Sequence, residues 1–371
     1  MKIGSALRLI AGNLAVFIGL VMGLLFLVSL IGDIYNLAKS HIPKNDKRAE
    51  LPVYKDHEKA RRIYQDQRES NSRYVPFAEW RQPQYASENL NIDENGYRMH
   101  RIGTDNNDAN AETFGFYGSS TVWGTGVDDD GTLPAQFDKI TTRYIVSNYG
   151  ERGYTSMQNL IDLITQINTN RAPKTVVFYG GLNDISVDCN LALTTRLNSH
   201  GTESRIQGAL DRTANENYLY NNIAAPLLAI TSSVVGSDKG ARNAGCSSNP
   251  QRAEEVAELM VRNFEMMDTL VTAYGGRFHA FLQPSAYFGK PRIDYLDLDD
   301  EGFRFEKEQA NAVIPLVIRK LKQRGVTWFT DIRDSFDGTD QFLLDHAHPS
   351  PAGNALLAQR IKATLEQSAL Q

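Results

Sequence analysis

The chain has 371 residues and a formal net charge of −5; 42% of its residues are hydrophobic and 22% are charged. This balance is typical of a globular protein, and the length suits one large domain or two ordinary ones. The negative net charge argues against a nucleic-acid-binding protein, because such proteins present a basic surface. No segment repeats with a period of 20–50 residues, which argues against solenoids and propellers.

Residues 9–32 follow a short tail of residues 1–8 and carry no charge; Asn13 is their only strongly polar residue. As a helix, this segment would extend roughly 36 Å, enough to cross the hydrocarbon core of a membrane. A cleaved signal peptide is the alternative. Its apolar region is usually about 7–15 residues long and ends in an Ala-x-Ala-like site, and neither holds here. We therefore expect a retained, single-pass transmembrane helix.

The charges on the two sides of this segment favour opposite orientations. Lys2 and Arg8 precede the segment, whereas four basic residues between Lys39 and Arg48 follow it. Because the first positive cluster usually dominates, we expect an inner-membrane protein whose main domain is extracytoplasmic. In such an oxidising compartment Cys189 and Cys246 can form a disulfide, and the alternative is two unrelated buried thiols.

Residues 33–110 form a predicted connecting region between the membrane segment and the main domain. Residues 44–73 are rich in charge, and a helix is expected at about 55–69. The stretch that follows mixes turn signals with five aromatic residues, namely Tyr74, Phe77, Trp80, Tyr85 and Tyr97. A solvated stalk would not need these side chains, so we expect the region to pack on the main domain as a collar or small hairpin.

From residue 111 to residue 371 short apolar segments alternate with amphipathic ones. Strands are predicted at 113–117, 144–148, 175–179, 278–282 and 327–330, and helices at 133–140, 157–168, 254–274, 305–323 and 352–365. An apolar stripe from Val256 to Val271 indicates core packing rather than a cofactor site. The alternation predicts an α/β fold with a central parallel sheet covered on both faces. Ligands bind at the carboxyl ends of such strands.

Residues 185–249 interrupt this alternation, because they contain few periodic apolar runs. Long irregular insertions in compact domains are often lids or specificity loops, and decoration of the rim is the alternative.

Two acidic clusters have simpler interpretations than metal binding. Asp128–Gly131 is expected to form a polar turn and a helix start. The segment Asp297–Gly302, with Glu308, nearly fits a calcium-binding EF-hand loop but departs at its fifth position, so we favour acids that cap a helix. We expect neither a metal nor a cofactor.

A serine and an Asp-x-x-His segment carry the chemistry. Ser120 follows a predicted strand, and Asp345 and His348 lie three residues apart far downstream. Serine is a poor nucleophile at neutral pH, so it needs an imidazole base and a carboxylate to orient that base. These residues predict Ser120 as the nucleophile, His348 as the general base and Asp345 as the orienting acid.

Four blocks in the same order resemble the SGNH (GDSL-type) hydrolase family over about residues 111–367. The blocks are Gly118-Ser119-Ser120 with Gly124, Asn148–Gly153, Gly181–Asp184, and Asp345–His348. Ser119 stands where the family has an aspartate outside the triad, a departure that concerns support of the local loop more than activity. The resemblance implies a flavodoxin-like, three-layer fold with Gly153 as the functional glycine of its block.

The oxyanion of the reaction is expected to bind Asn183 and the backbone N–H groups of Ser120 and Gly153. Acyl transfer concentrates charge on one oxygen, and a fixed donor there is worth about 3–4 kcal/mol. A side chain at Gly153 would block the approach of its N–H to substrate. Alternatives remain for single residues: an Asx turn at Asn183, a capping pair at Ser119 and Ser120, and His346 as the base or as part of a His-x-His zinc pair.

The sequence therefore predicts a membrane-anchored serine esterase of the cell envelope. Ser120 would attack an ester carbonyl, His348 would shuttle the proton, and water would release the acyl group. The resemblance to envelope-associated members suggests O-acetyl esters on carbohydrate, so the expected partners are an acylated polysaccharide and the membrane, without nucleic acid. An O-acyltransferase that uses the same acyl-enzyme and a catalytically inactive envelope scaffold are the alternatives.

Overall fold

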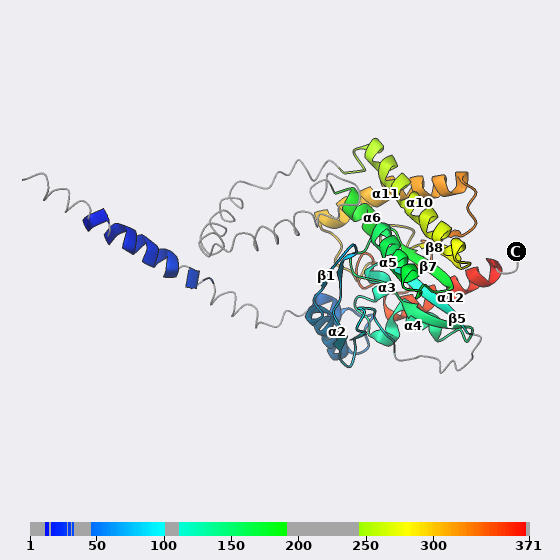
Figure 1. Cartoon of the computed structure of the whole chain (residues 1–371), viewed down its shortest axis with the longest axis horizontal. Coiled ribbons are helices and arrows are strands. Elements are labelled where there is room, and N and C mark those ends of the chain that lie inside the picture. The colour runs from blue at the N-terminus through cyan, green and yellow to red at the C-terminus, as the bar shows by residue number, and fades with distance from the viewer. Residues whose placement is uncertain are drawn as a thin grey trace, which may run out of the picture. The chain divides into compact units, whose positions relative to one another are not determined.

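The computed structural model describes residues 12–14, 16–27, 29–30, 32, 46–100, 111–190 and 245–368 (Figure 1). The chain divides into two units, residues 1–44 with 203–239 and residues 45–202 with 240–371. The predicted tail 1–8, parts of the predicted membrane segment and most of the predicted insertion lie outside the described residues.

In the first unit the described residues between 12 and 32 are helical. Large apolar side chains along this stretch are exposed, among them Phe17 at 64%, Leu20 at 69% and Leu24 at 62%. Within the described part of the chain, no helix is both long enough and apolar enough to cross a membrane.

A sheet of five parallel strands forms the centre of the second unit, in the spatial order β6-β5-β7-β8-β9. The strands are β5 (Glu112–Gly118), β6 (Tyr144–Asn148), β7 (Thr175–Gly180), β8 (Arg277–Leu282) and β9 (Phe329–Asp331). Phe116 of β5 pairs with Asn148 on one side and Val177 on the other. The first strand lies between the second and the third, which is the flavodoxin-like order, and the predicted parallel α/β sheet is confirmed.

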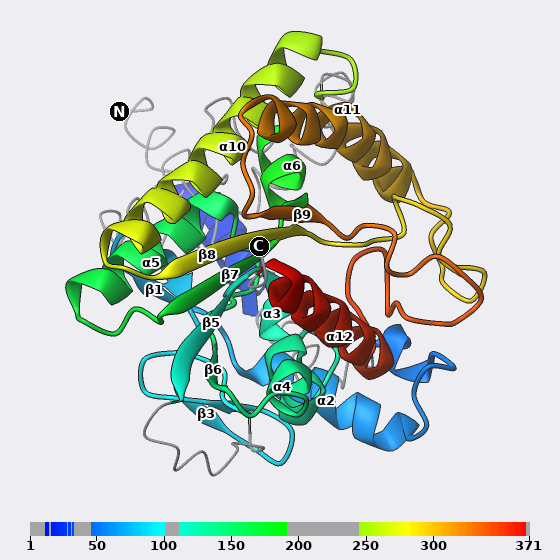
Figure 2. The same ribbon diagram turned by 90° about the vertical axis from the view of Figure 1, so that its right-hand side faces the viewer.

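Helices cover both faces of the sheet and complete the three layers (Figure 2). One face carries α5 (Ser156–Asn168), α6 (Leu182–Asp188), α10 (Pro250–Ala273) and α11 (Glu301–Gln323), and the other carries α4 (Leu133–Asp138) and α12 (Pro351–Ser368). Phe178 of β7 contacts Phe264 of α10 with ring centroids 5.0 Å apart. Its neighbour Val177 joins the opposite core, because successive strand residues face opposite ways.

Capping residues set the points at which two of the helices begin. Asn249 caps α10 by accepting a hydrogen bond from the Arg252 N–H, 3.1 Å away, and Pro250 occupies the first turn. The stripe from Val256 to Val271 is buried, so the core-packing interpretation is confirmed. Asp300 caps α11 by accepting from the Phe303 N–H at 2.6 Å, which is the capping use expected of that acidic cluster.

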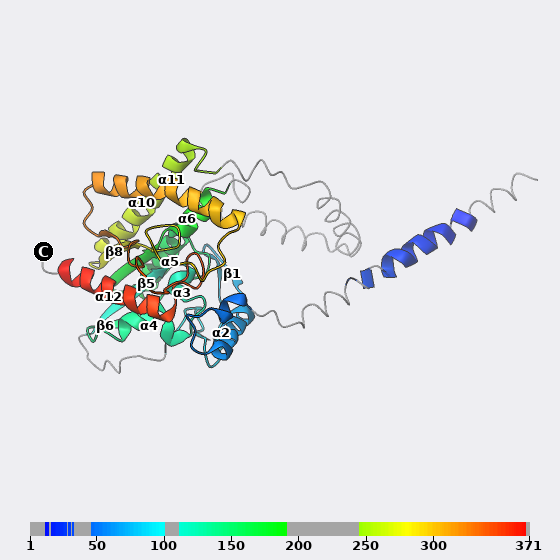
Figure 3. The same cartoon turned by 180° about the vertical axis from the view of Figure 1, so that it is seen from behind.

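Residues 46–100, which we call the collar, pack on the second unit's sheet domain (Figure 3). The collar contains the 3-10 helix η1 (Lys47–Glu50), α2 (His57–Glu69) and two short hairpins, β1 (Arg73–Val75) with β2 (Glu79–Arg81) and β3 (Tyr85–Ala86) with β4 (Asn91–Ile92). Gln67 of α2 donates to the carbonyl oxygens of Gly124 and Val127, at 3.0 Å each. The collar is therefore bound to the loop that follows the candidate nucleophile.

Two of the five collar aromatics are exposed, contrary to the packing predicted for this region. Tyr74 and Phe77 are 66% and 86% exposed. They lie on the β1–β2 hairpin and its turn, and a two-stranded hairpin has an outer face that no second layer covers. Trp80 does pack inward, because its Nε1 donates to the Arg152 carbonyl oxygen at 2.8 Å.

Candidate active site

The turn between β5 and the short helix α3 (Ser120–Trp123) places Ser120 at the carboxyl edge of the sheet. A Cβ at Gly118 would collide with the Tyr179 carbonyl oxygen of the neighbouring strand, so only glycine lets β5 end this close to β7. Ser119 is the N-cap residue of α3, and its hydroxyl lies 3.3 Å from the Thr121 hydroxyl. The two adjacent serines therefore face different surroundings.

The structure brings together the three residues expected to form the catalytic triad. His348 Nε2 lies 2.8 Å from Ser120 Oγ, and its Nδ1 lies 2.8 Å from both carboxylate oxygens of Asp345. Asp345 Oδ1 also accepts the backbone N–H groups of Ala347 and His348, at 2.9 Å each. Asp345 thus fixes both the imidazole ring and the turn that carries it, which leaves Nε2 facing the serine.

The charge of Asp345 is fixed by its surroundings. Burial alone would raise the pKa of this carboxyl group. The interactions with His348, and then with His346 and Arg48, outweigh burial and hold the pKa of Asp345 well below its usual range. The carboxylate is therefore ionised at neutral pH, as the orienting acid of a triad must be.

His346, the alternative base, has other partners. Its Nε2 lies 3.6 Å from Glu306 Oε2, and its ring stacks on Tyr287 with centroids 5.5 Å apart. Burial and the Glu306 carboxylate raise the pKa of Tyr287, so the phenol stays protonated and donates to Glu306. These contacts place His346 beside the site but do not join it to Ser120.

Asn183 reaches the site from the first turn of α6, which begins after Gly181. Its Nδ2 donates to the Tyr154 carbonyl oxygen at 3.0 Å, and the amide has a second hydrogen. Asn183 lines the same cavity as Ser120 and His348. The backbone N–H of Ser120 lies in the first turn of α3, where helix N–H groups have no intrahelical acceptor.

Gly153 lies in the loop that supports Asn183, one residue before Tyr154. Its φ of 83° is in the left-handed region, and a Cβ there would lie 3.1 Å from the Trp80 ring. Both conditions favour glycine. Gly153 is not among the described residues that line the cavity, so its role as a donor stays a prediction.

Two cavities meet at the site. The one that contains Ser120, Asn183 and His348 has a volume of about 50 Å³. A second cavity, of about 440 Å³, extends beside it between the collar and the start of α11. Glu306 and His346 line both cavities. A small pocket at the nucleophile therefore adjoins a larger one on the side of Asp345.

Sequence reasoning missed two residues that hold the site together. Asp184 accepts hydrogen bonds from the backbone N–H and the hydroxyl of Ser156, which fastens α6 to the start of α5. Asp184 belonged to the block Gly181–Asp184 in the sequence, but no role was predicted for it. The other missed residue is Arg48 of the collar, whose Nη1 lies 2.6 Å from Asp345 Oδ2. No local pattern pointed to that contact.

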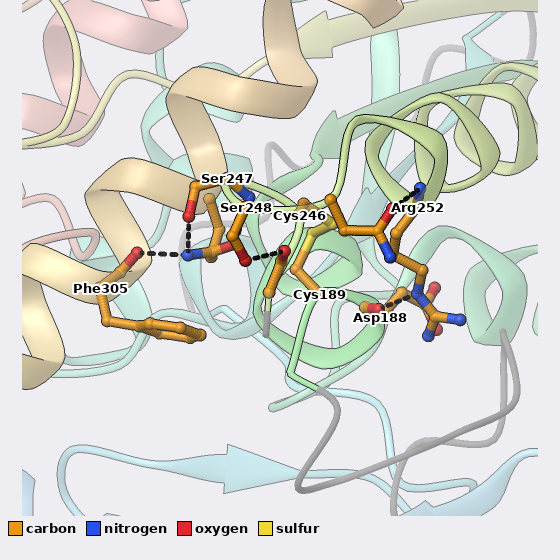
Figure 4. Close-up of a disulfide and its surroundings, with 10 residues drawn as sticks. Asp188, Cys189, Cys246, Ser247, Ser248, Arg252 and Phe305 are labelled. Carbon is orange, nitrogen blue, oxygen red and sulfur yellow. Dashed lines mark hydrogen bonds between the residues drawn. A yellow bond between two sulfur atoms is a disulfide. The ribbon is translucent and has the colours of Figure 1, made fainter. Parts of the chain in front are cut away.

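Cys189 and Cys246 form a disulfide rather than two separate thiols (Figure 4). The bond joins the residue after α6 to the segment before α10, and the two Cα atoms are 5.1 Å apart. Arg252 of α10 adds a hydrogen bond from its Nε to the Asp188 carbonyl oxygen at 2.8 Å. Residues 185–188, at the start of the predicted insertion, belong to α6, and residues 191–244 lie outside the described part.

Comparison with known proteins identifies the family. Est24, a carbohydrate acetylesterase from Sinorhizobium meliloti, is 14% identical over 70% of this chain and 100% of its own, with a TM-score of 0.39. A G-D-S-L lipolytic protein from Veillonella parvula is 13% identical over 68% and 97%, with a TM-score of 0.38. No curated protein matches. The GDSL-like lipase/acylhydrolase family model matches residues 107–361, and the chain therefore belongs to this family of SGNH hydrolases that act on esters.

Proposed function

We propose that the protein is a serine esterase that removes short acyl groups, acetyl above all, from hydroxyl groups of carbohydrate. The observation that carries this proposal is the contact of 2.8 Å between His348 Nε2 and Ser120 Oγ, with Nδ1 held by Asp345. A catalytically inactive scaffold would not need this alignment of nucleophile, base and acid.

The proposed reaction has two stages. Ser120 Oγ bonds to the ester carbonyl carbon while its proton passes to His348 Nε2, and the negative charge collects on the carbonyl oxygen near Asn183. The C–O bond to the alcohol breaks, and His348 returns the proton to the departing oxygen. Water then attacks the acyl-enzyme, His348 takes its proton and gives it to Ser120, and the carboxylic acid leaves.

The size of the cavity at Ser120 supports a short acyl group. Its volume of about 50 Å³ is well below the roughly 300–1,000 Å³ of sites for drug-sized ligands. The adjoining cavity of about 440 Å³ is in the range of small-molecule sites. It is lined by aromatic residues such as Tyr295 and by carboxylates such as Asp297, which suits an alcohol component with apolar faces and hydroxyl groups.

The test is the acyl-length dependence of ester hydrolysis by the full chain. We expect p-nitrophenyl acetate to be hydrolysed with a kcat/KM at least about tenfold above that of the octanoate, because even one misfit methylene costs about 1–3 kcal/mol. A fluorophosphonate probe should label Ser120. Equal rates for both esters would contradict the short-acyl proposal, and an enzyme that neither reacts with the probe nor hydrolyses either ester would contradict the esterase proposal itself.

A carbohydrate O-acyltransferase is the second candidate, because the larger cavity beside Ser120 could hold an acceptor sugar in place of the departing alcohol. The chemistry differs only in whether water or a sugar hydroxyl attacks the acyl-enzyme. An assay of acyl-donor consumption with and without an acceptor sugar separates the two. Acylated sugar as the main product would favour the transferase.

We also propose that residues 9–32 anchor the protein in the inner membrane, with residues 45–371 on the extracytoplasmic side. The uncharged sequence and the exposed apolar side chains of the helical residues support the anchor. The disulfide supports an oxidising compartment. We expect full-length protein in the membrane fraction, with Cys189 and Cys246 resistant to alkylation until reduced. A mature N-terminus near Asp33, or thiols that react without reduction, would contradict these proposals.

A further inference from the structure

Arg48 connects the collar to the acid of the triad. The residue lies in η1, and its side chain reaches a carboxylate 297 positions later in the chain. Arg48 Nη1 lies 2.6 Å from Asp345 Oδ2, and both side chains are largely removed from solvent, with 32% and 16% of their surface exposed. A contact this short between charged groups is a charge-assisted hydrogen bond.

The guanidinium group is held in place by residues of the collar itself. Asp46 accepts from Arg48 Nε at 3.0 Å and from Nη2 at 2.8 Å, which is a two-point contact of planar groups. The guanidinium carbon lies 4.8 Å from the ring centre of Tyr64 in α2. Contacts within the collar therefore fix the guanidinium group of Arg48 independently of Asp345, and they leave Nη1 directed toward the Asp345 carboxylate.

Each oxygen of the Asp345 carboxylate has its own set of donors. Oδ1 accepts two backbone N–H groups, and both oxygens lie 2.8 Å from His348 Nδ1. Oδ2 takes Arg48 as its additional donor. Without Arg48, Oδ2 would keep only the imidazole as a hydrogen-bond partner in the described part of the chain, and the carboxylate could turn about its terminal torsion, which has a broad energy minimum.

We propose that Arg48 is a positioning residue that aligns Asp345 and, through it, the general base His348. This inference rests on the assignment of Ser120, His348 and Asp345 as the triad. Arg48 touches neither the nucleophile nor the base, and its effect reaches the reaction through the carboxylate. The collar is in this way part of the catalytic apparatus, because it supplies a side chain that the α/β domain lacks.

The charge of Arg48 has an effect that a purely structural residue would not have. A cation beside Asp345 disfavours a second positive charge on His348, because it cancels part of the carboxylate's attraction for the imidazolium. Without Arg48 the imidazole should bind its proton up to higher pH, and protonated imidazole cannot accept the serine proton. The other charged or titratable groups that interact with Asp345 are unchanged by the substitution: His346, His348, Tyr64 and Tyr287.

The experiment compares three variants of the full chain with the wild type on p-nitrophenyl acetate across pH. We expect Arg48→Gln and Arg48→Met to lower kcat by roughly 10- to 100-fold with little change in KM. We expect both to move the acid limb of the kcat/KM profile upward by about half to one pH unit. Arg48→Lys keeps the charge, so its acid limb should stay at the wild-type position. Arg48→Met retains an apolar stem against Tyr64 if the glutamine variant folds poorly.

Arg61→Gln is the matched control, because Arg61 belongs to the same collar and forms an exposed ion pair with Glu50, 2.7 Å from Nε to Oε1. Exposed pairs contribute little, so this variant should match the wild type. The inference would be overturned if the acid limb stayed unshifted in both charge-free variants, or if both variants failed to fold. In either case Arg48 would be merely structural. An inactive wild type would instead contradict the esterase proposal, so the two failures are distinguishable.

Discussion

Ser120→Ala and His348→Ala should each lower kcat by about 10⁴-fold or more, and the double variant should be no worse than either single one. The reason is that the two side chains act as one unit: a serine without its base is not activated, and a base without its serine has nothing to activate. Their contact of 2.8 Å is the structural basis of this expectation. Steady-state hydrolysis of p-nitrophenyl acetate, with the melting temperature of each variant, measures it.

Ser119→Ala is the control for this prediction. Ser119 is adjacent in sequence and is also a serine, but its hydroxyl faces Thr121 rather than His348. The variant should keep most of the wild-type activity. If Ser119→Ala were inactive and Ser120→Ala active, the nucleophile would have been assigned to the wrong serine. If neither substitution changed the rate, the hydrolysis would not arise from this site.

Asn183→Ala should lower kcat by about 10²- to 10³-fold and change KM little, because a donor to the oxyanion acts mainly in the transition state. The amide also donates to the Tyr154 carbonyl oxygen, so part of any loss could reflect a displaced loop. Asn311→Ala is a matched control: the Asn311 side chain makes the same kind of bond, at 2.8 Å to the Lys307 carbonyl oxygen, on an exposed helix face.

The control variant should retain full activity and the wild-type melting temperature. A loss for Asn183→Ala that appears in KM instead of kcat would indicate that the amide binds the ground-state ester. Unchanged kinetics would show that Asn183 forms only an Asx-type support for its loop, which was the alternative interpretation of the sequence.

Much of the sheet could be predicted because buried parallel strands are short apolar runs with polar ends. The expected ends of β6 agree with the observed strand, and those of β5, β7 and β8 agree to within one residue. Strand β9 was placed about two residues early, since it has only three residues and all of them are half-buried, which gives a weak pattern. The helix α6 was not predicted at all, because seven residues are too few to show a period.

The candidate site was predictable where its residues lie close together in the chain or follow a strand. Asp345 and His348 are three residues apart, so one turn sets their geometry. Arg48 could not be found in this way, because its partner lies 297 residues away. In the sequence Arg48 served only as one of the positive charges after the predicted membrane segment, whereas in the structure its charge is paired with Asp46 and Asp345.

The disulfide also determines how mechanical load would pass through the molecule. Cys189 and Cys246 close the chain between them into a covalent loop whose base lies between α6 and α10. Tension on that loop would pull on both cysteines, and the sulfur–sulfur bond would hold them together, so the end of α6 and the start of α10 could not be drawn apart. The load would enter the two helices as a pair. Asn183, six residues before Cys189, therefore lies on a helix whose end is covalently joined to the segment before α10.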